Sequence, residues 1–270
     1  MQIGLIGCGN MARALARGWG RPLLCADPVA ERARSLAAEV GGEALASNAE
    51  VAARADVLVL CHKPAQLAAV AAEVGAGETP VASILAVTPL AKLRDAYPGR
   101  PVYRFIPSLP VEVRQGAVVQ AAGPGILTGE DAGGEDAGGE GAALDGAVAG
   151  LFAELGTLVV LDDALVDVAM GLMACAPAYV ALVAEAQIDA GVRRGIPAEQ
   201  GAQMVVQTLA GTAELLRRRD HDTLAVRREV SSPGGLTARG VDALERAGLR
   251  RAFSDALDAV LEPAPTGGRR

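Results

Sequence analysis

The chain opens on an apolar, strand-like run, Gln2–Ile6, that leads directly into residues 7–12, GCGNMA. This segment fits the pattern GxGxxA. Gly7 would permit a tight turn, Gly9 would let a pyrophosphate approach the backbone, and Ala12 would let helix and strand pack closely. The amides at the N-terminus of the following helix are then available to bind phosphate. This strand–turn–helix start predicts an α/β domain that binds a dinucleotide.

One acid stands where such a domain contacts the adenosine ribose. Asp27 ends the apolar run Leu23–Ala26 and lies 20 positions after Gly7, which is the spacing typical of a ribose-binding carboxylate. The pair Asp27-Pro28 also fits a helix cap with proline at the first helical position, and both roles are compatible. Because a carboxylate at the ribose repels a 2′-phosphate, the sequence favours NADH over NADPH.

Strand-like and helix-like segments alternate through the first half of the chain. The expected strands are Gln2–Ile6, Leu23–Ala26, Val57–Cys61, Val81–Leu85, Val102–Ile106, Ala117–Ala121 and Thr157–Leu161, and the early connections Val29–Val40 and Ala65–Val74 have helical period. After Leu161 only long helical stretches follow, namely Ala178–Arg194, Ala198–Arg219 and Thr237–Leu261. The pattern predicts a Rossmann domain with a mostly parallel sheet over residues 1–161 and an all-α domain over residues 162–270.

The amino-acid composition limits the classes of function that the chain can have. Hydrophobic residues make up 51% of the 270 residues, and the net charge is −7, of which five acids lie in the Gly-rich segment 129–141. This segment, with its GEDAG repeat, is expected to be a surface loop, and the rest of the chain is nearly neutral, which argues against nucleic-acid binding by bulk charge. Four cysteines without a CxxC pair and two histidines do not predict a metal site.

One apolar stretch raises the question of whether it forms a membrane-spanning helix. Asp167 and Glu185 bracket 17 uncharged residues, fewer than the roughly 20 that a spanning helix needs, and Pro177 interrupts them. We expect a deeply buried helix of a soluble protein there. No basic segment precedes the first apolar run, so a cytoplasmic location is expected. The apolar helical part is expected to bury its surface against a second copy of the chain, in a homodimer or a higher homo-oligomer.

Several segments together resemble the pyrroline-5-carboxylate reductase family. The matching segments are Gly7, Cys8, Gly9, Asn10 and Met11 (GxGNM); Asn48, residues 55–57 (ADV) and 62–64 (HKP); residues 104–110 (RFIPSLP); residues 177–180 (PAYV); Gln207, Thr208 and Gly211; and residues 230–237 (VSSPGGLT). The resemblance implies a Rossmann domain followed by an interlocked dimerisation domain, with the active site where the two meet. It implies hydride transfer from NADH or NADPH to the C=N carbon of 1-pyrroline-5-carboxylate, a cyclic imine, which gives proline.

The SPGG segment is the part of this resemblance that carries chemistry. Gly234 and Gly235 precede a helix, so their amides and those of Leu236 could hold the substrate carboxylate. Thr237, on the first turn, could offer its hydroxyl to the imine nitrogen or to a water beside it and is the predicted catalytic residue. Alternatively, Ser232-Pro233 only caps the helix and the glycines only form a turn.

Other predicted ligand contacts are less specific. Lys63 and Pro64 follow a strand where the sheet meets its ligand, so they and Ser108 are candidates for the cofactor site. Asn48 could reach the adenosine end, although the pattern Ser47-x-x-Glu50 also fits a capping box. Asp162 falls near a family acid that could approach the substrate. His62 and His221 are expected at the surface.

Departures from the family pattern leave the substrate open. The family asparagine is replaced by Ser108, SGSGPAY is replaced by residues 173–179 (MACAPAY), the AAGV segment contains Leu85–Val87, and the first threonine after SPGG is replaced by Leu236. The alternatives are a reductase of another cyclic imine and a cofactor-binding dimer with little catalysis. A β-hydroxyacid dehydrogenase is disfavoured, since it needs a lysine on a C-terminal helix and none follows Lys92.

Overall fold

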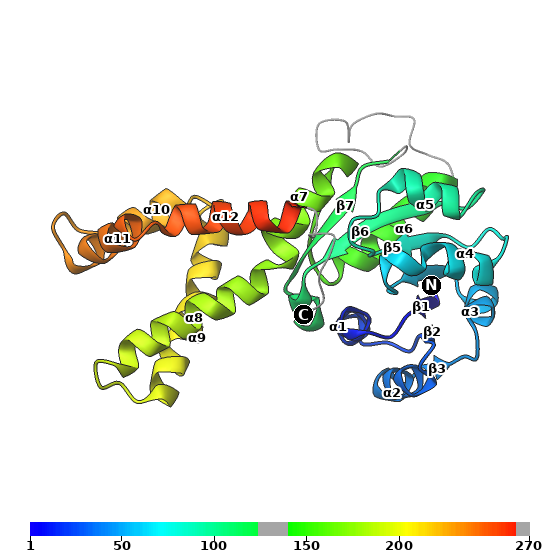
Figure 1. Cartoon of the computed structure of the whole chain (residues 1–270), viewed down its shortest axis with the longest axis horizontal. Helices are drawn as coiled ribbons and strands as arrows, with labels where there is room; N and C mark the ends of the chain where they lie inside the picture. Colours follow the sequence, from blue (N-terminus) through cyan, green and yellow to red (C-terminus); the bar gives the residue numbers. More distant parts are fainter. Residues whose placement is uncertain (124–139, 263–270) are drawn as a thin grey trace, which may run out of the picture. The chain divides into compact units, whose positions relative to one another are not determined.

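The computed structural model describes residues 1–123 and 140–262 (Figure 1). Its contacts divide the chain into two units, Met1–Pro177 and Ala178–Arg270. Most of the acidic segment 129–141 and the tail after residue 262 lie outside the described residues. Val166 and Ala169 pack into a core cluster of the first unit, so the division of contacts falls beyond the predicted domain boundary at Leu161.

In the described residues of the first unit, eight strands form one sheet in the order β3-β2-β1-β4-β5-β6-β7-β8. The strands are β1 (Ile3–Ile6), β2 (Leu24–Ala26), β3 (Glu43–Ala44), β4 (Val57–Leu60), β5 (Val81–Ser83), β6 (Val102–Pro107), β7 (Gly116–Ala121) and β8 (Gly156–Leu161). All neighbours pair in parallel except β6 and β7, which are antiparallel. The predicted mostly parallel sheet is therefore confirmed, with β3 as an additional two-residue edge strand.

Helices cover both faces of this sheet, because alternate strand residues are buried on opposite sides. The helical segments are α1 (Asn10–Trp19), α2 (Ala30–Val40), α3 (Asn48–Arg54), η1 (Pro64–Gln66), α4 (Leu67–Val74), α5 (Leu90–Ala96), η2 (Leu109–Val113), α6 (Glu140–Ala153), η3 (Asp163–Leu165), α7 (Val166–Ala169) and the π-helical turn η4 (Met170–Ala174). Leu5 and Val59 belong to the core cluster with α1, α2 and α6, whereas Leu58 and Leu60 pack with α3, α4 and α5. The strand order reverses between the parallel strands β1 and β4, because β2 and β3 are added on one side of β1 and β4 on the other. Such a switch point is where sheets of this kind bind ligands.

The second unit is entirely helical in its described part. Its helices are α8 (Ala176–Val192), α9 (Ala198–Arg218), α10 (Thr223–Glu229), α11 (Leu236–Arg246) and α12 (Leu249–Leu261). The expected single helix Thr237–Leu261 is wrong, because Gly248 adopts a left-handed φ of 81° and divides it into α11 and α12. Among residues 178–262, only Gly201 and Val226 are buried.

The apolar stretch between Asp167 and Glu185 differs from its prediction. It lies in a helical segment, Asp163–Val192, that is long and apolar enough to cross a membrane by length and composition alone. Only 17% of its most apolar window is buried within the chain. The expected deep burial is therefore not reached within one copy, and large side chains such as Leu172 and Leu182 are 70% and 65% exposed.

Candidate cofactor and substrate sites

The turn after β1 has the geometry that a pyrophosphate requires. Gly7 has a φ of 96°, and a Cβ there would lie 2.9 Å from backbone atoms of both Cys61 and His62. Gly9 has open space around its Cα, since a Cβ would meet no atom within 4 Å. Ala12 is buried against the sheet. Only a glycine fits the first position, whereas the second is kept free for a ligand.

The N-terminus of α1 carries free amides. Gly9 is the N-cap residue and no side chain caps the helix, so the first turn, which begins with Asn10 and Met11, keeps unsatisfied N–H groups. The amide of Cys8 is different, because it donates to Asp27 Oδ2 at 2.8 Å. Cys8 therefore shapes the turn, while the residues after it can bind an anion.

Asp27 joins the two turns at the carboxyl ends of β1 and β2. Its Oδ2 accepts the Cys8 amide, and its Oδ1 accepts the amide of Val29 at 2.8 Å. The predicted cap at Asp27-Pro28 is wrong by two residues, since Val29 is the N-cap of α2. The carboxylate remains half-exposed and lines a cavity of about 380 Å³ together with Gly9 and Arg32.

Asn48 lines the same cavity from α3. Ser47 caps the helix by accepting the amide of Glu50 at 3.1 Å, so the predicted capping residue is Ser47 and Asn48 begins the helix. The Asn48 side chain, 9% exposed, donates its Nδ2 to Glu73 Oε2 on α4 at 2.5 Å. Asn48 is therefore held in the wall of this cavity and joins α3 to α4.

The loop after β4 closes the other side of this cavity. Lys63 is exposed and its amide donates to Gln66 Oε1 at 3.2 Å, while Pro64 opens η1. His62, which was expected at the surface, is half-buried, and its Nδ1 lies 2.9 Å from the Lys63 carbonyl. Burial lowers the pKa of His62, so the ring is neutral at pH 7. His221 is exposed, as expected.

Cysteine thiols beneath the turn are neutral. A hydrogen bond with Cys25, reinforced by burial, raises the pKa of Cys8. Burial raises the pKa of Cys61 as well. Neither sulfur is a thiolate at pH 7, so both act as small apolar side chains.

The turns after β5 and β6 lie at the same edge of the sheet, because these strands are parallel. Val87, in the segment that departs from the family pattern, has a φ of 51° and is 65% exposed. A β-branched residue is strained in this region. Ser108 is buried, and its Oγ accepts the Ala117 amide at 2.9 Å, so the hydroxyl proton and one lone pair remain for a ligand.

A buried arginine is the main feature that sequence reasoning did not assign. The Arg104 side chain is fully buried and pairs with Asp163 at 2.7 Å and with Asp167 at 2.5 Å. Asp163 Oδ2 also accepts the Leu90 amide at 3.0 Å, whereas the predicted Asp162 is exposed and its backbone carbonyl caps η3. The arginine of the RFIPSLP segment was the available signal, but its partners are 59 and 63 positions away.

The SPGG loop lies in the second unit. Like the turn after β1, it combines a glycine of positive φ with a glycine N-cap that has no side-chain cap. Gly234 has a φ of 69° with open space around it, and Gly235 is the N-cap of α11 without a side-chain cap. A Cβ at Gly235 would lie 2.3 Å from Ser232 Oγ. Leu236 is 80% exposed and Thr237 is exposed on the first turn. These groups form an uncapped helix N-terminus with a hydroxyl beside it, which suits a carboxylate.

Known proteins resemble the chain over its whole length. A family model described as pyrroline-5-carboxylate reductase dimerisation matches residues 163–265, and one described as NADP oxidoreductase, coenzyme F420-dependent, matches residues 2–87. The chain is 33% identical to the pyrroline-5-carboxylate reductase of Thermus thermophilus, over 96% of each protein. It is 30% identical to that of Synechocystis sp., over 100% of this chain and 99% of the relative. Its fold is similar to that of Plasmodium falciparum pyrroline carboxylate reductase with NADP bound, with a TM-score of 0.80 and 24% identity over 96% of this chain and 95% of the other.

Proposed function

The chain belongs to the pyrroline-5-carboxylate reductase family, and on that premise we propose that it reduces 1-pyrroline-5-carboxylate to proline with NADH or NADPH. The observation that carries this proposal is the identity of 30–33% with named reductases across essentially the full length of both proteins. The uncapped N-termini of α1 and α11 support it, since the reaction needs one anion site for a pyrophosphate and one for a carboxylate.

The first unit fits a nicotinamide dinucleotide. Open space at Gly9 and the free amides of α1 suit the pyrophosphate, and the cavity beside Asp27 and Asn48 suits the adenosine half. Lys63, Pro64 and Ser108 stand at the strand ends toward which the nicotinamide half would extend. The bound cofactor supplies the hydride, and these residues position it.

We further propose that NADH is preferred. Asp27 lines the cavity that would hold the adenosine ribose, and its carboxylate would repel a 2′-phosphate there. Arg32 lines the same cavity and would attract that phosphate. Steady-state kinetics with the two cofactors tests this preference. A kcat/KM higher for NADPH than for NADH would refute it, and Arg32→Ala would then be expected to reverse the order.

The second unit supplies the substrate contacts. Gly234, Gly235 and Leu236 offer backbone amides to the substrate carboxylate, which fixes the ring for attack at the imine carbon. Thr237 donates its hydroxyl to the imine nitrogen, directly or through a water, and so assists protonation of the product amine. Asp162 is a weaker candidate for a substrate contact, since its exposed carboxylate has no fixed partner among the described residues.

Dimerisation follows from the exposure of the second unit. Its described helices bury only Gly201 and Val226, so their apolar faces need a partner surface. We propose a homodimer or higher homo-oligomer in the cytoplasm, with no membrane or nucleic-acid partner. Light scattering of detergent-free protein tests this, because a membrane-bound chain would require detergent and a monomer would contradict dimerisation.

One assay separates the catalytic alternatives. Oxidation of NADH and NADPH is followed with pyrroline-5-carboxylate, with six-membered cyclic imines and with imines that lack the carboxylate. Turnover only on other imines would favour a reductase of another cyclic imine, for which the strained Val87 is a specific reason. Cofactor binding without any turnover would favour a cofactor-binding dimer with little catalysis.

A variant pair tests the role of Thr237. Thr237→Ala is expected to lower kcat about 10–100-fold with little change in cofactor Kd. Thr223→Ala, at the first position of α10, is the matched control and should leave kcat unchanged. Equal activity of both variants would remove Thr237 from the mechanism.

A further inference from the structure

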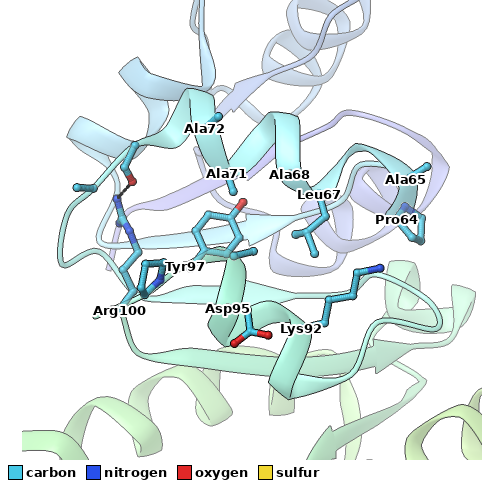
Figure 2. A pocket seen from close by; sticks show the side chains of 14 residues that line it. Pro64, Ala65, Leu67, Ala68, Ala71, Ala72, Lys92, Asp95, Tyr97 and Arg100 are labelled. Atoms are coloured by element: carbon cyan, nitrogen blue, oxygen red, sulfur yellow. Dashed lines mark hydrogen bonds between the residues drawn. The ribbon is translucent and has the colours of Figure 1, made fainter.

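A groove of about 730 Å³ lies between α4 and α5, away from the cavity beside Asp27 (Figure 2). Ala68, Ala71 and Ala72 of α4 form its upper wall, and Lys92 and Asp95 of α5 form its lower rim. These walls leave room because the side chains of α4 are short on this side. None of the sites described above uses the groove, although Pro64 stands at its end.

The floor of the groove holds an unpaired polar group. Tyr97 is 2% exposed, and Figure 2 shows its ring between the two helices with the hydroxyl directed toward Ala71. That hydroxyl is buried and has no hydrogen-bond partner among residues 1–123 and 140–262. Burial raises the pKa of Tyr97 to about 12, so it remains a donor at neutral pH. Buried hydroxyls without partners are unusual, and this one lacks only an acceptor entering from the groove.

The rim carries two charges of opposite sign. Lys92 and Asp95 are exposed, and neither forms an ion pair with any residue in the described parts of the chain. They stand three positions apart on α5, where Cβ atoms are about 5–6 Å from each other. This spacing suits one molecule with neighbouring negative and positive groups. Arg100 does not compete, because its guanidinium donates to the carbonyls of Thr79 and Gly75.

Helix α4 is a wall shared by two cavities. On this helix, Ala69, Val70 and Glu73 line the cofactor cavity, and Leu67, Ala68, Ala71 and Ala72 line the groove. Each set follows the spacing of one helical face, so the two faces belong to one rigid element. Asn48 is bonded to Glu73 on this helix. A ligand that moves α4 to reach Tyr97 would therefore alter the wall of the cofactor cavity.

We propose that this groove is a second binding site for a small zwitterion with an apolar side chain, an α-amino acid, and that its occupancy changes cofactor affinity through α4. The carboxylate of the ligand pairs with Lys92, its ammonium with Asp95, and its side chain lies on the alanines of α4. A carboxylate oxygen also accepts the Tyr97 hydroxyl. Occupancy of the groove is independent of the proposed reaction, and only the coupling rests on the cofactor site.

The test titrates L-valine into the full-length protein and follows backbone amide shifts by NMR, without imine or turnover. We expect a Kd of about 1 mM, with shifts centred on α4 and α5. L-Valinamide, which lacks the carboxylate, and 3-methylbutanoate, which lacks the ammonium, are expected to bind at least about tenfold more weakly.

Four variants locate the site. Lys92→Met and the groove-filling Ala72→Leu should weaken L-valine binding about tenfold or more, and Tyr97→Phe by a smaller factor. Arg94→Met, a loss of charge on α5 outside the groove, is the matched control and should change nothing. All four should keep basal turnover.

The coupling is measured separately. The NADH Kd, followed by fluorescence, should shift severalfold at saturating L-valine in the parent and in Arg94→Met, and not in Ala72→Leu. Absence of binding at 20-fold the expected Kd, or shifts confined to residues 234–237, would overturn the site. Binding in the groove with an unchanged NADH Kd would overturn the coupling.

Discussion

One methyl group placed at Gly7 or at Gly9 should have opposite consequences, although the two residues belong to the same turn. Gly7 faces protein backbone and Gly9 faces open space. The variant Gly7→Ala therefore tests the fold of the turn, whereas Gly9→Ala tests the ligand site. Each variant is the control of the other, because both add one methyl group within three residues.

The expected cost at Gly7 has two parts. Its φ of 96° is disfavoured for alanine, which costs about 1–3 kcal/mol. The new Cβ would also lie 2.9 Å from backbone atoms of Cys61 and His62, and relieving such overpacking costs about 1–3 kcal/mol. We therefore expect the free energy of unfolding, measured with urea, to fall by about 2–6 kcal/mol.

The expected result at Gly9 is different. Its φ of −74° and ψ of −171° are accessible to alanine, and only the N-cap preference is lost, at about 0.5–1 kcal/mol. The methyl group, however, occupies the space that the pyrophosphate would need. Loss of one charge-assisted hydrogen bond to the amides weakens NADH binding by about 10–100-fold, which a fluorescence titration measures.

Either of two results would refute this reasoning. Unchanged NADH affinity in Gly9→Ala would mean that the dinucleotide does not approach this turn. A stability of Gly7→Ala equal to that of the parent would mean that the contact with the loop after β4 is not tight. Loss of binding in Gly7→Ala alone would be uninformative about the ligand, because the turn itself is altered.

Three further outcomes follow from the structure. Asp163→Asn should lower the free energy of unfolding by about 2–3 kcal/mol, since the buried Arg104 guanidinium loses one of its two carboxylate partners. Urea unfolding measures this change, and a decrease below about 0.5 kcal/mol would contradict a stabilising role of the Arg104–Asp163 pair. The lowered pKa of His62 means that the unfolded chain binds the proton first, so stability should fall as pH drops below about 6.5, and His62→Gln should flatten that fall in a pH series of urea titrations. Val87→Gly should change the free energy of unfolding by less than about 1 kcal/mol, because relief of backbone strain offsets the lost side-chain contacts. The same variant should raise kcat/KM for six-membered relative to five-membered imines. An unchanged ratio would place Val87 outside the substrate site.

The elements that sequence predicted best are those with local causes. The turn of residues 7–12 follows from glycine spacing, and the buried strands follow from apolar runs bounded by polar residues. The two-residue strand β3 was missed, because Glu43–Ala44 carries no apolar pattern and forms only by pairing with β2. Gly248 offered a visible signal for the break between α11 and α12, since glycine readily adopts positive φ.

For the candidate site, the sequence allowed residues to be named, but the hydrogen-bond and ion-pair partners of these residues could not be named from it. Asp27 was assigned to the ribose from spacing, but its two backbone partners depend on how the turns after β1 and β2 meet. Arg104 had a visible motif, yet its carboxylates come from η3 and α7 and could not be identified without the fold. The predicted burial of the stretch after Asp167 is deeper than the burial observed within one chain. An apolar sequence indicates that its side chains need a covering surface, but not whether the same chain or a second copy provides that surface.

Two helix N-termini, one in each unit, share a construction that ordinary capping does not explain. Gly9 and Gly235 are N-caps in extended conformation, and each follows a glycine of positive φ after at most one residue. A glycine cap costs only a few tenths of a kcal/mol relative to serine or aspartate, but it leaves the first amides unbonded. By contrast, the side chains of Ser47 and Asp222 accept hydrogen bonds from first-turn amides of α3 and α10. The chain thus gives up little stability to leave two helix N-termini open to anions, and the proposed reaction between a dinucleotide and a carboxylate substrate would need two such termini.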